Sequence, residues 1–197
     1  FEYEHKFGSS AYLGASASFV FNDFIAFDIT FMNGEGYNQL QTDNSYKSGL
    51  GITITPVKGL TARFYVDYIE HAEIQSTYVS FLGYKYKDLV KAGIEYNYQS
   101  NSSFRKDRNQ NGFSGYVSVN MSNKIEIFGR FDKLWSNTLE GDPYGWNIYR
   151  DGSAIITGVQ YSPIKNIKIA ANYQDWYPYA KNLENESYFY LNLEYKF

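Results

Sequence analysis

The sequence predicts an all-β protein whose strands form one antiparallel sheet. Segments of about ten residues alternate between apolar and polar side chains along the whole chain, and short and long connections alternate between these segments. Aromatic residues make up 20% of the chain, which suits strands, and no segment has convincing helical spacing. No apolar stretch approaches the roughly 18 residues of a membrane-spanning helix.

The first six segments follow one another from residue 11 to residue 98. Their apolar faces are the odd positions from Ala11 to Phe21, the odd positions from Ile25 to Phe31, the even positions from Leu50 to Ile54 and from Leu60 to Tyr68, and the even positions from Val90 to Tyr98. The segment at 75–86 is rich in Val, Phe and Tyr, but both of its faces are mixed. It is therefore predicted as a strand without an assigned register.

Five further segments complete the pattern. Their apolar faces are Phe113 to Met121, Ile125 to Phe131, Ile155 to Tyr161, Ile167 to Tyr173 and Phe189 to Phe197, each read at alternate positions. Since side chains alternate between the two faces of a strand, each of these segments has one apolar and one polar face. Eleven strands are predicted from Ala11 onward.

The connections fall into two classes that alternate strictly along the chain. The short ones are 22–23, 56–59, 86–88, 122–124 and 163–166, and the long ones are 33–46, 69–75, 100–112, 136–152 and 178–186. This alternation places all tight turns at one end of the sheet and all long loops at the other. Such an arrangement is typical of transmembrane β-barrels, although soluble up-and-down barrels share it.

The polar faces decide between a soluble and a membrane barrel. They carry too many charges for a small dry core, namely Asp28, Lys47, Arg63, Asp67, Lys91, Glu95, Glu126, Arg130, Asp132, Lys168, Glu194 and Lys196. If the apolar face meets lipid, these charges line a wet lumen. The fold class predicted is an antiparallel transmembrane β-barrel, with interfacial aromatics Tyr46, Tyr68, Tyr98, Trp135, Tyr161 and Trp176 near the strand ends.

The strand count leaves two arrangements open. Residues 1–7 also alternate, so they supply a twelfth strand of a closed barrel in one arrangement. In the other, residues 1–10 end a loop, and the chain is the C-terminal segment of a larger barrel. We expect the second, because seven residues fall short of the roughly 9 to 11 that a membrane strand needs. Either way, residues 1–197 form a single outer-membrane β-barrel domain.

Composition and motifs exclude several function classes. The chain has no Cys, which excludes disulfides and thiolate metal sites, and its net charge of −3 gives no reason to expect nucleic acid as a partner. His71 with Ser76 and Glu73 is the one formal candidate for catalysis, but an isolated rim His is more often a solvated loop residue. The loop at 140–147 with Asp151 has oxygens for calcium, which ordinary turn chemistry also explains. We predict no catalytic residue, no metal and no cofactor.

The polar-face charges are the candidate functional residues. We predict that the pore is lined by Arg63, Asp67, Lys91, Glu95, Arg130, Asp132 and Lys168. Arg63 with Asp67, and Lys91 with Glu95, share one face of a strand. The twelve polar-face charges are balanced between acids and bases, which argues against strong ion selection.

The final segment, Tyr188 to Phe197, resembles the C-terminal strand of outer-membrane proteins, with alternate apolar residues and a terminal Phe. More of the chain resembles porins of the phosphate-selective O/P-like superfamily of Bacteroidetes type, in their C-terminal portion. The residues that carry this resemblance are Asn33-Gly34-Glu35-Gly36-Tyr37, Thr55-Pro56-Val57-Lys58-Gly59-Leu60, Ser162-Pro163-Ile164-Lys165-Asn166 and Asp175-Trp176-Tyr177-Pro178-Tyr179. The sequence has no polar-face ladder of Arg and no Lys cluster, so the resemblance does not extend to phosphate selectivity.

The resemblance implies a porin-like channel in the outer membrane of a Gram-negative bacterium, for passive diffusion of small polar or charged solutes, with about sixteen strands in the whole barrel. It also implies contact with outer-membrane lipid and lipopolysaccharide, recognition by the barrel-assembly machinery through Phe197, and a homotrimer or an envelope complex. The alternative is a plugged structural barrel that serves as a subunit of an outer-membrane assembly. Its interior would be filled by Tyr65, Tyr116, Phe128, Tyr188 and Tyr190.

Overall fold

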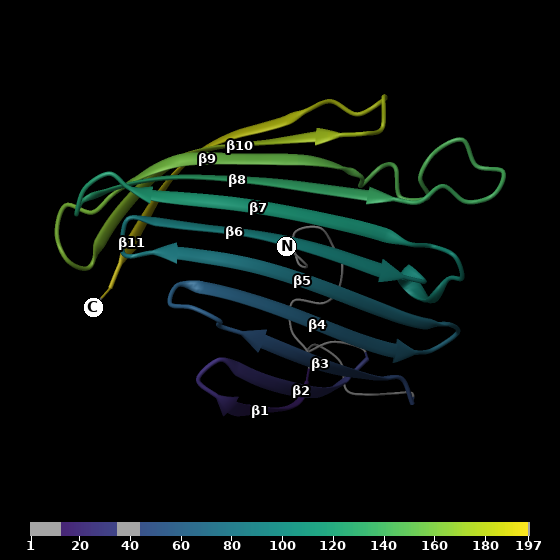
Figure 1. Cartoon of the computed structure of the whole chain (residues 1–197). Coiled ribbons are helices and arrows are strands. Elements are labelled where there is room, and N and C mark those ends of the chain that lie inside the picture. The colour runs from purple at the N-terminus through teal and green to yellow at the C-terminus, as the bar shows by residue number, and fades with distance from the viewer. Residues whose placement is uncertain (1–12, 35–43, 197) are drawn as a thin grey trace.

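The computed structural model describes residues 13–34 and 44–196, which form one antiparallel sheet of eleven strands paired in chain order (Figure 1). The strands are β1 (Gly14–Asn22), β2 (Ile25–Asn33), β3 (Tyr46–Ile54), β4 (Leu60–Glu70), β5 (Ile74–Tyr86), β6 (Val90–Ser100), β7 (Gln110–Asn120), β8 (Ile125–Ser136), β9 (Gly152–Tyr161), β10 (Ile167–Pro178) and β11 (Glu186–Tyr195). One short 3₁₀ turn, η1 (Ser102–Phe104), follows β6. Within the described part of the chain, no helix is long and apolar enough to cross a membrane.

The tight turns lie together at one end of the sheet, at the left in Figure 1, and the other connections lie at the opposite end. Local chemistry forms these turns. The Asn22 side chain accepts the backbone N–H groups of Phe24 and Ile25 between β1 and β2. Gly59 has a φ of 89° in the next turn, a conformation that glycine adopts without strain.

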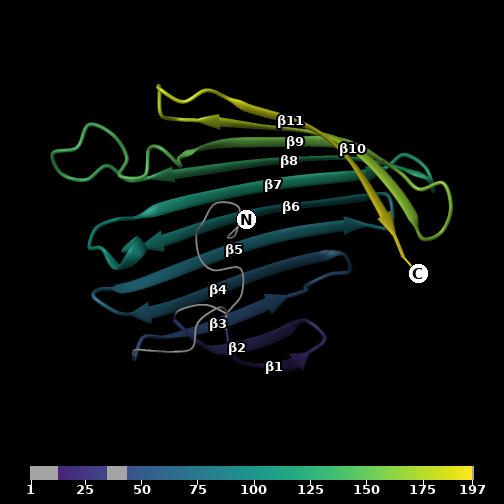
Figure 2. The same ribbon diagram turned by 180° about the vertical axis from the view of Figure 1, so that it is seen from behind.

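One connection differs from the expectation. β4 continues through Glu70 and β5 begins at Ile74, so the connection between them is only residues 71–73 instead of 69–75. The alternation of short and long connections is therefore less strict than the sequence suggested. The placement of the two kinds of connection at opposite ends of the sheet is confirmed (Figure 2).

The two faces of the sheet have opposite chemistry. Residues that pair directly across neighbouring strands lie on the same face of the sheet. The register therefore places Ile29, Leu50 and Val66 on the apolar face. It places Arg63 and Asp132 on the polar face. The apolar face is open to the surroundings, whereas much of the polar face is buried. The fold is the reverse of a water-soluble sandwich, in which apolar side chains are the buried ones.

Individual exposures make this inversion quantitative. Phe64 and Ile94 on the apolar face are 53% and 51% exposed, whereas Asp67 and Asn97 on the polar face are each 1% exposed. Polar side chains become buried on one face only if the sheet curves toward them. Curvature toward a polar interior, with apolar side chains left outside, is the arrangement of a membrane barrel wall.

The structure also resolves the register that the pattern left open. In β5, Thr77, Val79 and Phe81 share the polar face with Asp67 and Asn97, and the intervening residues face outward. Aromatic side chains gather on the apolar face near the long-connection end, where Phe31 stacks on Tyr46 at 5.2 Å, Tyr78 lies 6.1 Å from Tyr98, and Tyr96 lies 6.3 Å from Trp135.

The prediction of an interfacial aromatic on the apolar face is wrong for Trp176. Trp176 pairs in register with Ala154 and Glu186, so it lies on the polar face and not on the apolar one. The pattern failed here because Asp175 and Tyr177 next to it do not show which face is apolar.

Two predictions lie outside the described residues: the strand at 1–7 and the role of Phe197. Within the described residues the sheet is open, since β1 and β11 each pair with one neighbour. The number of strands in the whole barrel therefore stays a prediction.

Candidate functional site: the polar face of the sheet

Arg63 of β4 forms the best-defined ion pair of the polar face. Its two terminal nitrogens donate to Asp28 of β2, Nη1 to Oδ1 at 2.6 Å and Nη2 to Oδ2 at 2.9 Å, and Nη1 also donates to Thr53 of β3 at 2.9 Å. The pair bridges across β3, where Gly51 leaves the space that the two side chains occupy. A bidentate pair of this kind fixes both side chains against the wall.

A second pair joins Lys47 of β3 to Asp67 of β4. The Nζ atom lies 2.8 Å from Oδ2, and the two side chains are 10% and 1% exposed. The predicted neighbour of Asp67, Arg63, is thus engaged elsewhere, and each charge is paired with a residue of another strand. At this burial the pair is shielded from solvent far more than a surface salt bridge is.

Arg130 and Asp132 of β8 form the third pair, with the Nε atom donating to Oδ1 at 3.0 Å. The Asp132 side chain is 1% exposed, whereas that of Arg130 is 30% exposed. The acid is therefore covered, and the base is the part of the pair that solvent reaches.

The remaining predicted residues also lie on the polar face. Lys91 is exposed, and Glu95 accepts a hydrogen bond from the Asn97 side chain at 2.8 Å. Lys168 lies 4.0 Å from Glu194 near the tight-turn end. The structure thus brings all seven predicted residues to one face and distributes them over its height; it does not gather them into one cluster.

A chain of uncharged groups, missed by the sequence analysis, crosses the same face. The Gln110 amide donates to Gln99 at 2.9 Å, and the Gln99 amide donates to Thr77 at 3.2 Å. All three residues are nearly fully buried. The alternation of side chains in β6 and β7 predicts that Gln99 and Gln110 lie on this face. They were absent from the candidate residues because those were chosen among charged side chains only.

The large aromatics of the polar face lie against the wall. The ring of Tyr116 covers Gly93 and that of Phe128 covers Gly158, and a Cβ at either glycine would approach the ring to 2.6 Å. Glycine opposite an aromatic ring is a common way to pack a curved sheet. Tyr116 and Phe128, two of the five aromatics that the plugged alternative places in the interior, thus lie on the polar face over glycines of neighbouring strands.

A polar pocket of 610 Å³ lies on this face near the long-connection end. It is bounded by Asp132, Gln174, Trp176 and Glu186 from the strands and by Arg150 from the loop before β9. Both charge signs and an aromatic ring therefore meet in one open recess. The alternation of side chains along the strands predicts that the strand residues of this pocket share one face. It does not predict that Arg150, in the loop before β9, lies beside them.

The formal catalytic candidate, His71 with Ser76 and Glu73, is not assembled in the structure. Nδ1 of His71 lies 3.1 Å from Oγ of Ser45, whereas Ser76 pairs in register with Tyr68 on the apolar face. The ring of Phe104 lies 5.4 Å from that of His71. His71 and Ser76 thus do not form the candidate pair.

The loop considered for calcium is held by turn chemistry. Asp151 is buried and accepts the Ser136 backbone N–H at 2.9 Å and its hydroxyl at 2.5 Å. Burial raises the pKa of Asp151 above its ordinary value, against these hydrogen bonds. Gly141 has a φ of 84°, as a tight turn requires. Across residues 13–34 and 44–196, no three His, Asp or Glu side chains gather as a metal site would need.

Solved structures of bacterial outer-membrane channels share this fold. The outer membrane channel DcaP of Acinetobacter baumannii matches 93% of this chain with a TM-score of 0.71 at 11% sequence identity. The NanC porin matches 92% of this chain and 91% of its own with a TM-score of 0.52 at 14% identity. This chain spans 62% of the length of DcaP. No protein-family model and no curated protein matches the sequence.

The fold is that of an outer-membrane porin barrel. The all-β antiparallel architecture is confirmed, and it agrees with the outer-membrane location that the apolar outer face indicates. The narrower resemblance to phosphate-selective porins stays a prediction.

Proposed function

We propose that this chain forms part of the wall of an outer-membrane channel through which small polar or charged solutes diffuse passively. The observation that carries the proposal is the inversion of the two faces, with ion-paired polar side chains on the inside and open apolar side chains on the outside. Its likeness in fold to DcaP and NanC supports the proposal. In this assignment the predicted pore-lining residues face the lumen, and the wall is part of a larger barrel.

The charges predict weak selectivity between cations and anions. Among the described residues, the polar face carries acids and bases in equal number: Asp28, Asp67, Glu95, Glu126, Asp132, Glu186 and Glu194 against Lys47, Arg63, Lys85, Lys91, Arg130, Lys168 and Lys196. Most of the described ion pairs join one member of each set, so the net field along the wall is small. Local fields between paired charges still orient polar solutes as they pass.

Conductance of the purified protein in a planar bilayer tests the proposal. We expect a stable open conductance with a reversal potential close to zero in a gradient of potassium chloride. Lys91→Glu adds negative charge on the polar face without breaking a described ion pair, so the reversal potential shifts toward that of potassium. Lys165→Glu makes the same charge change in the turn after β9 and is the matched control.

Two results would count against the proposal. A silent bilayer with correctly inserted protein favours the plugged structural barrel. An equal shift in the Lys91→Glu and Lys165→Glu variants contradicts the assignment of the polar face to the lumen.

A further inference from the structure

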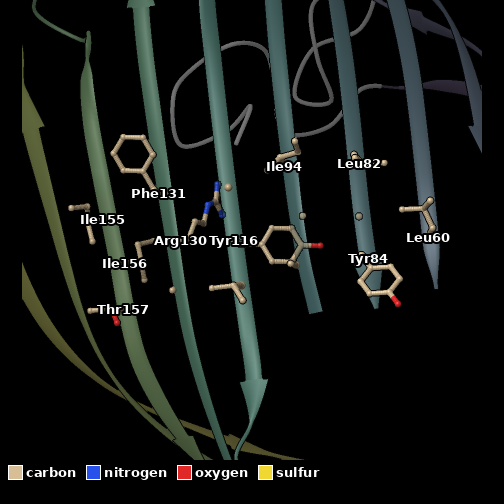
Figure 3. A pocket seen from close by; sticks show the side chains of 16 residues that line it. Leu60, Leu82, Tyr84, Ile94, Tyr116, Arg130, Phe131, Ile155, Ile156 and Thr157 are labelled. Atoms are coloured by element: carbon tan, nitrogen blue, oxygen red, sulfur yellow. The ribbon is translucent and has the colours of Figure 1, made fainter. Parts of the chain in front are cut away.

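A shallow, open apolar groove crosses the outer face of the sheet from β4 to β9. It has a volume of 680 Å³, and its walls include Tyr84, Ile94 and Phe131, which stand 39% to 51% exposed (Figure 3). Its floor is formed by Ala92, with Gly115 and Gly129 beside it. The residues belong to two adjacent rows of the sheet, so the groove is continuous across six strands.

Gly115 and Gly129 are two of the four glycines along the groove, and their register places them on its apolar face. Neither has a positive φ, and a Cβ would meet its nearest neighbour at 3.6 Å at Gly115 and 3.8 Å at Gly129, which is ordinary contact. On the polar face, by contrast, Gly93 and Gly158 are each covered by a ring. Glycine in a strand interior marks a bulge, a bend of a barrel wall, or a site where a ligand or another backbone approaches closely. Gly115 and Gly129 each leave room for at least a Cβ on the apolar face.

The groove opens at the tight-turn end of the sheet. One end of the groove is Leu60, the first residue of β4, next to a tight turn. The other end is Ile155, which lies three residues after the start of β9, where the long connection joins the strand. Six strands about 4.8 Å apart span roughly 24 Å across the sheet, which advances about 14 to 17 Å into a hydrocarbon core of about 30 Å when strands tilt by about 35 to 45°. A channel barrel has its short turns on the periplasmic side, so the groove runs from that interface into the hydrocarbon.

Two lysines flank the open end. Lys58 and Lys87 lie in the turns before β4 and after β5, and Nζ of Lys87 lies 5.4 Å from the ring of Tyr86 on the apolar face. Within the described residues neither lysine has an ion-pair partner, and the nearby Asp88 is paired with Lys85 at 3.0 Å. An apolar groove with two unpaired lysines beside its open end complements a molecule with a long hydrocarbon chain and an anionic head.

We propose that this groove binds one acyl chain of an anionic phospholipid of the periplasmic leaflet, with the phosphate at Lys87 and Lys58. The inference rests on the proposed membrane location of the chain. A second copy of this chain is the competing occupant, and the oligomer mass measured below distinguishes it from a lipid. A lipid chain is narrow and flexible enough to fill the full length.

Native mass spectrometry of the purified protein in detergent, titrated with 16:0/18:1 phosphatidylglycerol or phosphatidylcholine, tests this site. We expect one tightly retained phosphatidylglycerol per chain. Lys58→Gln/Lys87→Gln lowers that affinity about 25-fold, since each basic residue near an anionic lipid surface contributes about fivefold. The affinity for phosphatidylcholine, whose choline offsets the charge of its phosphate, falls by a smaller factor. Lys165→Gln, in another tight turn, is the matched control.

A second variant tests the groove without touching charge. Gly115→Leu/Gly129→Leu fills the floor at positions where a Cβ meets no clash, so retention of both lipids falls, whereas Ala171→Leu, elsewhere on the apolar face, leaves it unchanged. Heat-modifiable migration on SDS gels verifies that each variant is folded.

Equal lipid retention in the filled variant and the Ala171→Leu control overturns the proposal. A change of oligomer mass with lipid retained also overturns it and assigns the groove to a second copy. Flotation with liposomes and bilayer conductance on the same preparation test the channel separately. A protein that inserts and conducts but shows no lipid preference contradicts only the groove.

Discussion

The ion pair between Arg63 and Asp28 determines what Gly51→Ala does to stability. We predict that this change destabilises the protein when the pair is present and stabilises it when the pair is removed. A Cβ on Gly51 would lie 2.5 Å from Asp28 Oδ1 and 2.6 Å from Arg63 Nη2, so the two side chains must separate. A hydrogen bond to a charged group contributes about 1.5 to 3 kcal/mol, and partial exposure of this pair reduces that figure. Replacing glycine by alanine in a strand returns about 0.5 to 1 kcal/mol.

Gly51→Ala should therefore destabilise the wild-type protein by about 1 kcal/mol. An Asp28→Ala/Arg63→Ala background removes the three atoms nearest to that Cβ, so the same change should stabilise by about 0.5 kcal/mol. Reversible urea unfolding of the protein in lipid vesicles, followed by tryptophan fluorescence, measures both free energies of unfolding. An effect of the same sign in both backgrounds would refute the geometry of the pair.

Three further predictions follow from single contacts. Lys47→Met leaves the buried Asp67 carboxylate without its described cation and should cost about 3 to 5 kcal/mol of unfolding free energy, whereas Lys47→Met/Asp67→Asn recovers most of it. Because burial raises the pKa of Asp151 above 3.8, the folded state binds that proton more tightly than the unfolded chain does. The contribution of this proton to stability therefore declines as pH rises from the unfolded-state pKa to the folded-state pKa. The urea midpoint should be lower at pH 7 than at pH 4, and Asp151→Asn should lack this decline. Tyr116→Ala removes a ring from the lumen wall and should raise single-channel conductance, an increase that is absent if the ring faces lipid.

Alternation of side chains was enough to predict the strands and the face of every predicted site residue. The period of two is set by backbone geometry alone, so Lys91 and Arg130 fall on the polar face however the strands pair. What alternation did not provide is partners. Residues four apart on a strand are roughly 13 Å apart, too far for Arg63 to meet Asp67, whereas directly opposite residues lie about 4.5 to 5.5 Å apart. Pairing therefore depends on register, which no single segment of the sequence specifies.

Glycines supply part of the missing information, because their neighbours reveal what each face must accommodate. Gly51 lets Asp28 and Arg63 meet across a whole strand, a pairing at about 9.6 Å that a side chain on the intervening strand would block. On the polar face a glycine is thus a space already filled by the protein. On the apolar face Gly115 and Gly129 are spaces that the protein leaves unfilled. Ion pairs and rings explain the filled spaces on the inner face, and the acyl chain that we propose would explain the open spaces on the outer face.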